Sequence, residues 1–89
     1  MTKSEIGETA GKVWQCLIKN GRVPLSDLPR EVKADPVVVH EAIGWLAHED
    51  KVEFANSGRA DYVSLTDNEL RRLAYFLGED NKHDKIRNR

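Results

Sequence analysis

Residues 25–54 read LSDLPREVKADPVVVHEAIGWLAHEDKVEF, and this stretch decides the fold. Asp35-Pro36 predicts the start of a helix, because aspartate accepts hydrogen bonds from free amides at the N-cap and proline is favoured as the first helical residue. The helix is expected to run to about Asp50, since apolar residues recur at helical spacing up to that point. The residues on its inward side are Val39, Ala42, Ile43 and Leu46.

Two further helices are predicted before this one. Apolar residues at helical spacing place the first over residues 4–19, and Asn20-Gly21 supplies the left-handed residue that ends it. Residues 22–25 are expected to be extended, because Pro24 cannot continue a helix. A short second helix is expected over residues 26–33.

The chain after the long helix predicts a hairpin and a fourth helix. Residues 51–66 read KVEFANSGRADYVSLT, in which Asn56-Ser57-Gly58 marks a turn between two antiparallel strands. The alternating residues expected on the one buried face are Val52, Phe54, Val63 and Leu65. Thr66-Asp67-Asn68-Glu69 then predicts a capping box that opens a helix, which Gly78 ends. The apolar stripe of this helix is Leu70, Leu73, Ala74 and Leu77.

The order of these elements indicates an α+β protein with a winged helix-turn-helix. A lone hairpin is marginal in water, so a layer of helices is expected to cover it. Residues 22–25 can add a strand, which makes the antiparallel wing two- or three-stranded. Residues 1–78 are expected to form this domain, with its three-helix core and C-terminal helix, and residues 79–89 a polar, disordered tail.

Three stretches resemble known winged-helix proteins. Residues 25–54 resemble the general pattern, although Ala34 stands where such proteins often have glycine. IGETAGKVW at residues 6–14 and AIGWLAHEDKVEF at residues 42–54 resemble a small family of uncharacterised bacterial and archaeal winged-helix proteins, over roughly residues 4–77. Because helix-turn-helix folds mostly bind DNA, the resemblance implies a DNA-binding, transcription-regulator-like module, while a fold by itself fixes no activity.

Composition limits the partners that the chain can attract. The 89 residues carry 14 Lys and Arg against 15 Asp and Glu, a net charge of -1, so overall charge gives no attraction to nucleic acid or an anionic membrane. No apolar run approaches the roughly 20 residues that cross a membrane. Cys16 is the single cysteine, which excludes an internal disulfide and suits the cytoplasm.

The sequence offers no pattern for catalysis or for a cofactor. His40, His48 and His83 form no short metal-ligand motif, and Cys16 has no second cysteine beside it. No serine, histidine and aspartate trio is marked by a glycine-rich elbow, and Gly58 stands alone rather than in a phosphate-binding loop. We therefore expect no enzyme, no metal, no cofactor and no small-molecule ligand.

The long helix is poorly equipped to read DNA. Base edges are read by Arg, Lys, Asn or Gln, and residues 36–50 contain none of these. Glu49 and Asp50 at its end repel phosphates. DNA contact would therefore fall largely on the wing and the tail. The candidate residues are Arg59, Lys51, His40, Glu41, Lys82 and Lys85.

The same helix offers apolar residues that its inward stripe does not explain. Val38 and Trp45 either widen the core stripe or contact a second copy of the protein. Gly7 and Gly11 lie one turn apart on the first helix, where glycine is unfavourable. They indicate close approach of Trp45 or of a partner helix, or else they are simply tolerated in a loosely wound first turn. The alternative function is therefore a homodimerisation or protein-interaction module that does not bind DNA. Its candidate interface residues are Val37, Val38, Trp45, Gly7 and Gly11.

Overall fold

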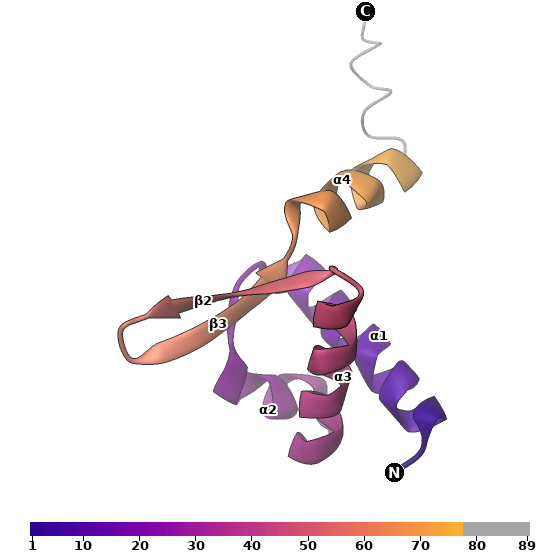
Figure 1. The fold of residues 1–89 in the computed structure, drawn as a ribbon, viewed down its shortest axis with the longest axis vertical. Coiled ribbons are helices and arrows are strands. Elements are labelled where there is room, and N and C mark those ends of the chain that lie inside the picture. Colours follow the sequence, from indigo (N-terminus) through magenta and orange to yellow (C-terminus); the bar gives the residue numbers. More distant parts are fainter. Residues whose placement is uncertain (78–89) are drawn as a thin grey trace, which may run out of the picture.

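In the computed structural model, which describes residues 1–77, three helices pack beside a small sheet and a fourth helix stands apart (Figure 1). The elements in chain order are α1 (Lys3–Asn20), β1 (Val23–Pro24), the 3-10 turn η1 (Leu25–Asp27), α2 (Leu28–Val32), α3 (Pro36–His48), β2 (Val52–Ser57), β3 (Ala60–Leu65) and α4 (Asp67–Phe76). This is an α+β winged helix-turn-helix, as the sequence predicts. No helix among these residues is long and apolar enough to cross a membrane.

The sheet has three antiparallel strands in the order β1-β3-β2. The extended segment after α1 supplies β1, in which Val23 pairs with Val63 of β3. On the other side of β3, Val52 pairs with Leu65 and Phe54 with Val63. The wing is therefore three-stranded, because the short β1 closes one edge of the β2–β3 hairpin.

Local signals set the ends of the two long helices. α1 ends at Gly21, whose φ of 79° is open to glycine and strained for other residues. α3 begins after Asp35, whose Oδ1 accepts a hydrogen bond of 2.8 Å from the Val37 amide. Both boundaries lie where the sequence predicts them. The α3 stripe of Val39, Ala42, Ile43 and Leu46 is buried as predicted, and it packs on α1 around Val13 and Leu17.

The second helix differs from the prediction in its first turn. Residues 25–27 form the 3-10 turn η1, and the α-helix begins only at Leu28. Pro29 explains the difference, because it has no amide to donate to the Leu25 carbonyl four residues earlier. The Leu28 amide donates to that carbonyl instead, which tightens the turn. α2 then ends at Lys33, which is left-handed with a φ of 56°.

The prediction that Phe54 is buried is wrong. Its side chain is 52% exposed, and Val52 is the single buried residue of β2. Phe54 pairs with Val63, which is fully buried, so the helices cover the central strand β3 at this level but not the edge strand β2. The alternating pattern therefore gives the strands correctly but not the width of sheet that the helices cover.

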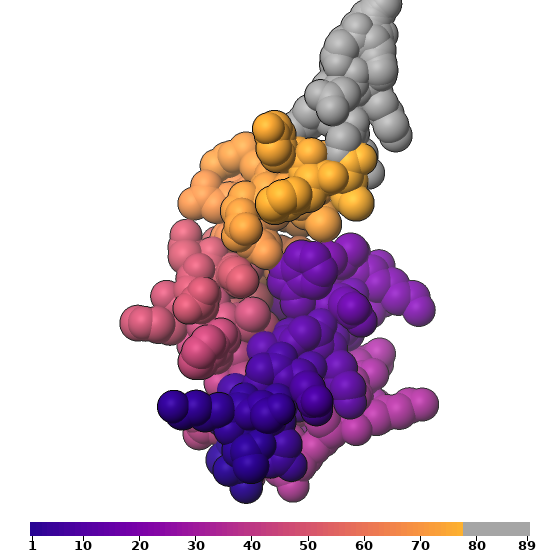
Figure 2. Space-filling view, turned by 90° about the vertical axis from the view of Figure 1, so that its right-hand side faces the viewer, coloured from indigo at the N-terminus to yellow at the C-terminus, as the bar shows by residue number. Residues whose placement is uncertain are grey.

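The apolar stripe predicted for α4 is covered only in part, because Leu73 and Ala74 are half-buried and the other two residues are exposed. Thr66 caps the helix as expected, and its Oγ1 accepts a hydrogen bond of 3.1 Å from the Glu69 amide. Yet Leu70 and Leu77 are 47% and 62% exposed, and Glu69 is the one buried residue of α4. The reason is that α4 projects from one end of the body instead of lying on it (Figures 1 and 2). The predicted stop at Gly78 and the tail lie outside the described residues.

Candidate functional site

A recess of about 330 Å³ lies where α3, η1 and the wing meet. We call it the wing recess, and its lining residues are Leu25, Ser26, His40, Arg59, Ala60 and Asp61. Three of these side chains carry hydrogen-bond donors: the Ser26 hydroxyl, the His40 imidazole and the Arg59 guanidinium. The recess thus collects donors from three elements that are distant in sequence.

The turn of the wing fixes the backbone that carries Arg59. Gly58 has a φ of 72°, which lets the chain reverse at this point. The Asn56 side chain spans the turn, because its Nδ2 donates to Asp61 Oδ1 at 2.8 Å and its Oδ1 accepts from the Gly58 amide at 3.1 Å. The Arg59 amide donates to the Ser57 carbonyl at 2.7 Å. Arg59 is therefore presented from an ordered turn, while Asp61, which also lines the recess, already accepts one hydrogen bond.

The outer side of α3 brings little else that suits DNA. His40, Glu41, Gly44 and His48 are exposed there, and Val37 is 59% exposed in the first turn. The helix contains no Lys, Arg, Asn or Gln. Direct reading of base edges needs such side chains, so this face of α3 is poorly suited to it.

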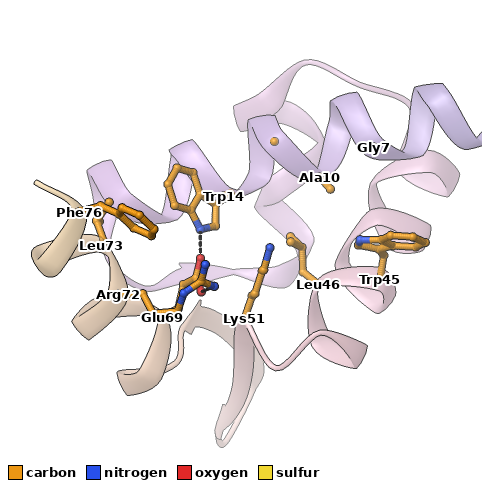
Figure 3. Close-up of a pocket in the computed structure, with 11 residues that line it drawn as sticks. Gly7, Ala10, Trp14, Trp45, Leu46, Lys51, Glu69, Arg72, Leu73 and Phe76 are labelled. Carbon is orange, nitrogen blue, oxygen red and sulfur yellow. Dashed lines mark hydrogen bonds and ion pairs between the residues drawn. The ribbon is translucent and has the colours of Figure 1, made fainter.

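A second hollow of about 560 Å³ lies between α1, the end of α3 and α4 (Figure 3). We call it the groove. Its lining residues are Gly7, Ala10, Gly11, Trp14, Trp45, Leu46, Lys51, Glu69, Arg72, Leu73 and Phe76. Trp14 Nε1 donates a hydrogen bond of 2.7 Å to Glu69 Oε2, and Arg72 Nη1 lies 3.3 Å from Glu69 Oε1. The groove is thus a mostly apolar surface with one buried, fully paired carboxylate at its side.

The structure divides the predicted DNA contacts between these two places. His40 and Arg59 line the wing recess together, and Glu41 is exposed on the same helix as His40. Lys51 instead lines the groove, where it is half-buried. The remaining two candidates, Lys82 and Lys85, lie outside the described residues. Within residues 1–77, the wing recess is therefore the place where the predicted contacts converge.

The predicted interface residues are divided as well. Trp45, Gly7 and Gly11 line the groove together. Val38 is half-buried and lines a different hollow near the start of α1, and Val37 is exposed at the start of α3. The sequence pattern of α3 therefore combines residues that belong to separate surfaces.

The exposure of Trp45 and the space around Gly7 and Gly11 decide between the alternatives for these residues. Trp45 is 56% exposed, so the interpretation that it widens the core is wrong. A methyl group placed on Gly7 or Gly11 would meet no atom within 4 Å. Close approach of Trp45 to these glycines is therefore also excluded, and no part of the described chain fills the space above them.

The family model described as "Winged helix-turn-helix domain (DUF2582)" matches residues 1–65. The chain belongs to this family. The matched segment ends with β3, so α4 lies beyond it.

Two proteins are similar to this chain in sequence. The uncharacterized protein MJ1608 of Methanocaldococcus jannaschii is 41% identical over 51 residues, which are 54% of this chain and 71% of that protein. The solution structure of protein BT2368 from Bacteroides thetaiotaomicron is 31% identical, with a TM-score of 0.65 over 73% of this chain and 79% of that one.

More distant structures share the fold alone. The Zalpha domain of PKZ from Carassius auratus, solved in complex with Z-DNA, has a TM-score of 0.59 at 18% identity and covers 68% of this chain and 97% of its own. Several transcriptional regulators have the same fold at 19% identity or less. The DUF2582 chain thus shares its fold with the Zalpha domain and with these transcriptional regulators.

Sequence reasoning missed the contact between Trp14 and Glu69. The spacing of Thr66 and Glu69 predicted that the glutamate side chain returns to the Thr66 amide. That amide donates instead to the Lys51 carbonyl at 3.0 Å, and Glu69 reaches α1. Ser26 of the wing recess was missed as well, since a serine at the start of a helix is first explained as a cap. Among residues 1–77, no group of three His, Cys, Asp or Glu could hold a metal.

Proposed function

We propose that this chain is a regulator-like module that binds duplex DNA through the phosphate backbone, with the wing recess as the contact. The observation that carries the proposal is the convergence of Ser26, His40 and Arg59 on one recess beside α3. Charge-assisted hydrogen bonds from arginine to phosphate oxygens are among the strongest in proteins, and their geometry is well matched. The ordered wing turn supports such a contact, because its hydrogen bonds fix the backbone that carries Arg59.

Base reading has a minor part in this proposal. Phosphate contacts position a protein on a duplex but carry no sequence information, and α3 lacks the side chains that would supply it. Asp61 and Glu41 also oppose a dense phosphate contact. The proposed binding is therefore weak and largely independent of sequence.

Fluorescence anisotropy with a labelled 20-base-pair duplex tests this proposal. With one phosphate neutralised by Arg59, the affinity falls about threefold between 50 and 200 mM salt, since each such contact adds about 0.9 to the logarithmic salt slope. Arg59→Ala removes most of that salt dependence and weakens binding at 50 mM salt. The matched control is Arg71→Ala, because Arg71 is exposed on α4 and does not line the wing recess. No binding by wild-type protein at 50 mM salt and tens of micromolar chain overturns the proposal.

A second candidate function is homodimerisation, with or without DNA. The specific observation is the groove, where Trp45 is 56% exposed and lines the same hollow as the open backbone at Gly7 and Gly11. Tryptophan is enriched at protein interfaces and carries much of their binding energy. Light scattering on a concentration series tests this function, since a dimer has twice the 10.1 kDa mass of the chain. Trp45→Ala is expected to shift the mass toward the monomer.

A further inference from the structure

We propose that the groove is covered by α4 of a second copy of this chain. Two chains related by a twofold axis would each lay the Leu70 and Leu77 edge of α4 across the other copy's groove, over the floor at Gly7 and Gly11. The inference rests on the homodimer proposed above, and it names the surfaces that form the dimer.

The first argument is that α4 is too little packed to stand as it does in water. It has ten residues, and isolated helices of that length are marginal even with favourable sequences. Its second half is the most exposed apolar segment of the described chain. The exposed fractions there are 74% for Tyr75, 73% for Phe76 and 62% for Leu77. A covering surface would bury these side chains and supply the missing packing.

The direction of α4 is nevertheless fixed by its first turn. The Thr66 hydroxyl donates to the Asp50 carbonyl at 2.9 Å, and the Thr66 amide donates to the Lys51 carbonyl. Trp14 holds Glu69 from the side of α1. The first turn of α4 therefore has a fixed direction, and the second half of the helix is the part that a partner would cover.

The same anchor turns the apolar edge of α4 away from its own body. Glu69 faces α1, and Leu70 and Leu77 lie about 100° and 80° around the helix from it, at 3.6 residues per turn. Both leucines are absent from the lining of the groove in their own chain. They are consequently free to reach another molecule.

The floor of the groove suits a helix. Gly7 and Gly11 lie one turn apart on α1, with nothing within 4 Å of the positions that a methyl group would take. Glycine is unfavourable inside a helix, so two of them on one face indicate that the bare backbone is used. Trp45 and Phe76 stand at opposite ends of this floor (Figure 3). The geometry provides room for close approach of a helix backbone between two aromatic walls.

Area and symmetry favour a second copy as the occupant. The exposed parts of Leu70, Phe76, Leu77 and Trp45 come to about 480 Å², if an aromatic side chain offers roughly 150–250 Å². This apolar area is more than half of the roughly 800 Å² that a standard interface buries on each partner. The Leu70 and Leu77 edge of α4 and the groove adjoin on one chain. A twofold axis would therefore place the edge of each copy in the groove of the other, as in isologous dimers. Residues 79–89 contain a single apolar residue, Ile86.

Light scattering at 5–500 µM chain tests the inference with the full-length protein. Wild type is expected to be a dimer, and Leu70→Glu combined with Leu77→Glu is expected to weaken dimerisation at least about 100-fold, as for central interface residues. Gly11→Leu is the second variant, because it fills the floor of the groove from the opposite surface and is also expected to yield a monomer. Circular dichroism checks that each variant is folded.

The matched control is Phe54→Glu, which places the same charge on an apolar residue that is 52% exposed on the wing. It should leave the dimer intact. If the wild-type dimer survives both the Leu70→Glu, Leu77→Glu variant and Gly11→Leu, the inference is overturned, but the proposed homodimer stands. The same holds if Phe54→Glu disrupts the dimer as strongly as these variants do. A wild-type monomer at 500 µM overturns the inference and the homodimer together, while DNA binding through Arg59 is decided by its own salt series.

Discussion

Trp14 Nε1 donates a hydrogen bond of 2.7 Å to Glu69 Oε2, which joins α1 to α4 across 55 positions of the chain. Glu69 is 6% exposed, and its Oε1 is paired with Arg72 within α4. A buried carboxylate needs such partners, because the loss of its hydration costs several kcal/mol. Since α4 has no other buried residue, this contact and the Thr66 hydrogen bonds to Asp50 and Lys51 together determine how the helix leaves the body.

Trp14→Phe removes the indole donor while keeping an aromatic ring. One oxygen of the buried carboxylate then loses its partner, and we expect the free energy of unfolding to fall by about 1–3 kcal/mol. Urea unfolding followed by circular dichroism measures this loss. The measurement is best made in the Leu70→Glu, Leu77→Glu background, so that dimerisation does not contribute.

Trp45→Phe is the control for this change, because the same substitution there removes no hydrogen bond between described residues and the side chain is 56% exposed. Surface substitutions of this kind usually alter stability by less than about 0.5 kcal/mol. Equal losses in the two variants would show that ring size, and not the bond to Glu69, is responsible for the effect.

The helices show how far the sequence predicts the fold. In α3, the spacing of Val39, Ala42, Ile43 and Leu46 predicted both the helix and its buried side. In α4, the same kind of spacing predicted the helix correctly but its burial only in part, since Leu77 is 62% exposed. Periodicity establishes that a helix has an apolar side, but which surface covers that side depends on how the helix leaves the body.

The candidate site was less accessible to sequence reasoning, for a related reason. Thr66, three residues before Glu69, is a plausible local partner for the Glu69 side chain. The Glu69 Oε2 atom instead accepts a hydrogen bond from Trp14 on α1. Likewise, nothing in the spacing of Ser26, His40 and Arg59 indicates that the three line one recess. Such convergence is set by the crossing of η1, α3 and the wing, which no single stretch of sequence encodes. Arg59 was found because a cation at a wing turn is exposed on any winged-helix fold.

Gly11→Ala is expected to stabilise the single chain. Alanine is favoured over glycine inside a helix by about 1 kcal/mol, and the added methyl group meets nothing within 4 Å. In the Leu70→Glu, Leu77→Glu background, that gain raises the melting temperature by about 4–8 °C for a domain of this size. Differential scanning calorimetry measures the shift.

Gly21→Ala provides the opposite case at the end of the same helix. Gly21 has a φ of 79°, and an alanine forced into the left-handed region costs about 1–2 kcal/mol. The two variants should therefore change the melting temperature in opposite directions. A lower melting temperature for Gly11→Ala would contradict the open space that the structure shows around a methyl group at Gly11.

Asp35→Ala is expected to weaken the start of α3. The Asp35 carboxylate accepts the Val37 amide at 2.8 Å, and loss of an N-cap of this kind costs about 1 kcal/mol. Asp35→Asn keeps an accepting oxygen and should retain most of the stability. Thermal unfolding of both variants separates the cap from the charge. Equal destabilisation by asparagine and alanine would assign the effect to the charge at the helix N-terminus instead.

Glu41→Lys is expected to tighten DNA binding if the wing recess is the contact. Glu41 is exposed on α3 one position from His40, so the change removes a repulsive charge and adds an attractive one beside the proposed phosphate site. One added phosphate contact steepens the logarithmic salt slope by about 0.9 and raises affinity several-fold at 50 mM salt. Glu31→Lys makes the same change in net charge on α2, where Glu31 lines a different hollow beside Lys12. Anisotropy titrations should therefore show a gain for Glu41→Lys that exceeds the gain for Glu31→Lys. Equal gains would mean that net charge alone attracts the duplex, and the site of contact would then have to be sought elsewhere than beside α3.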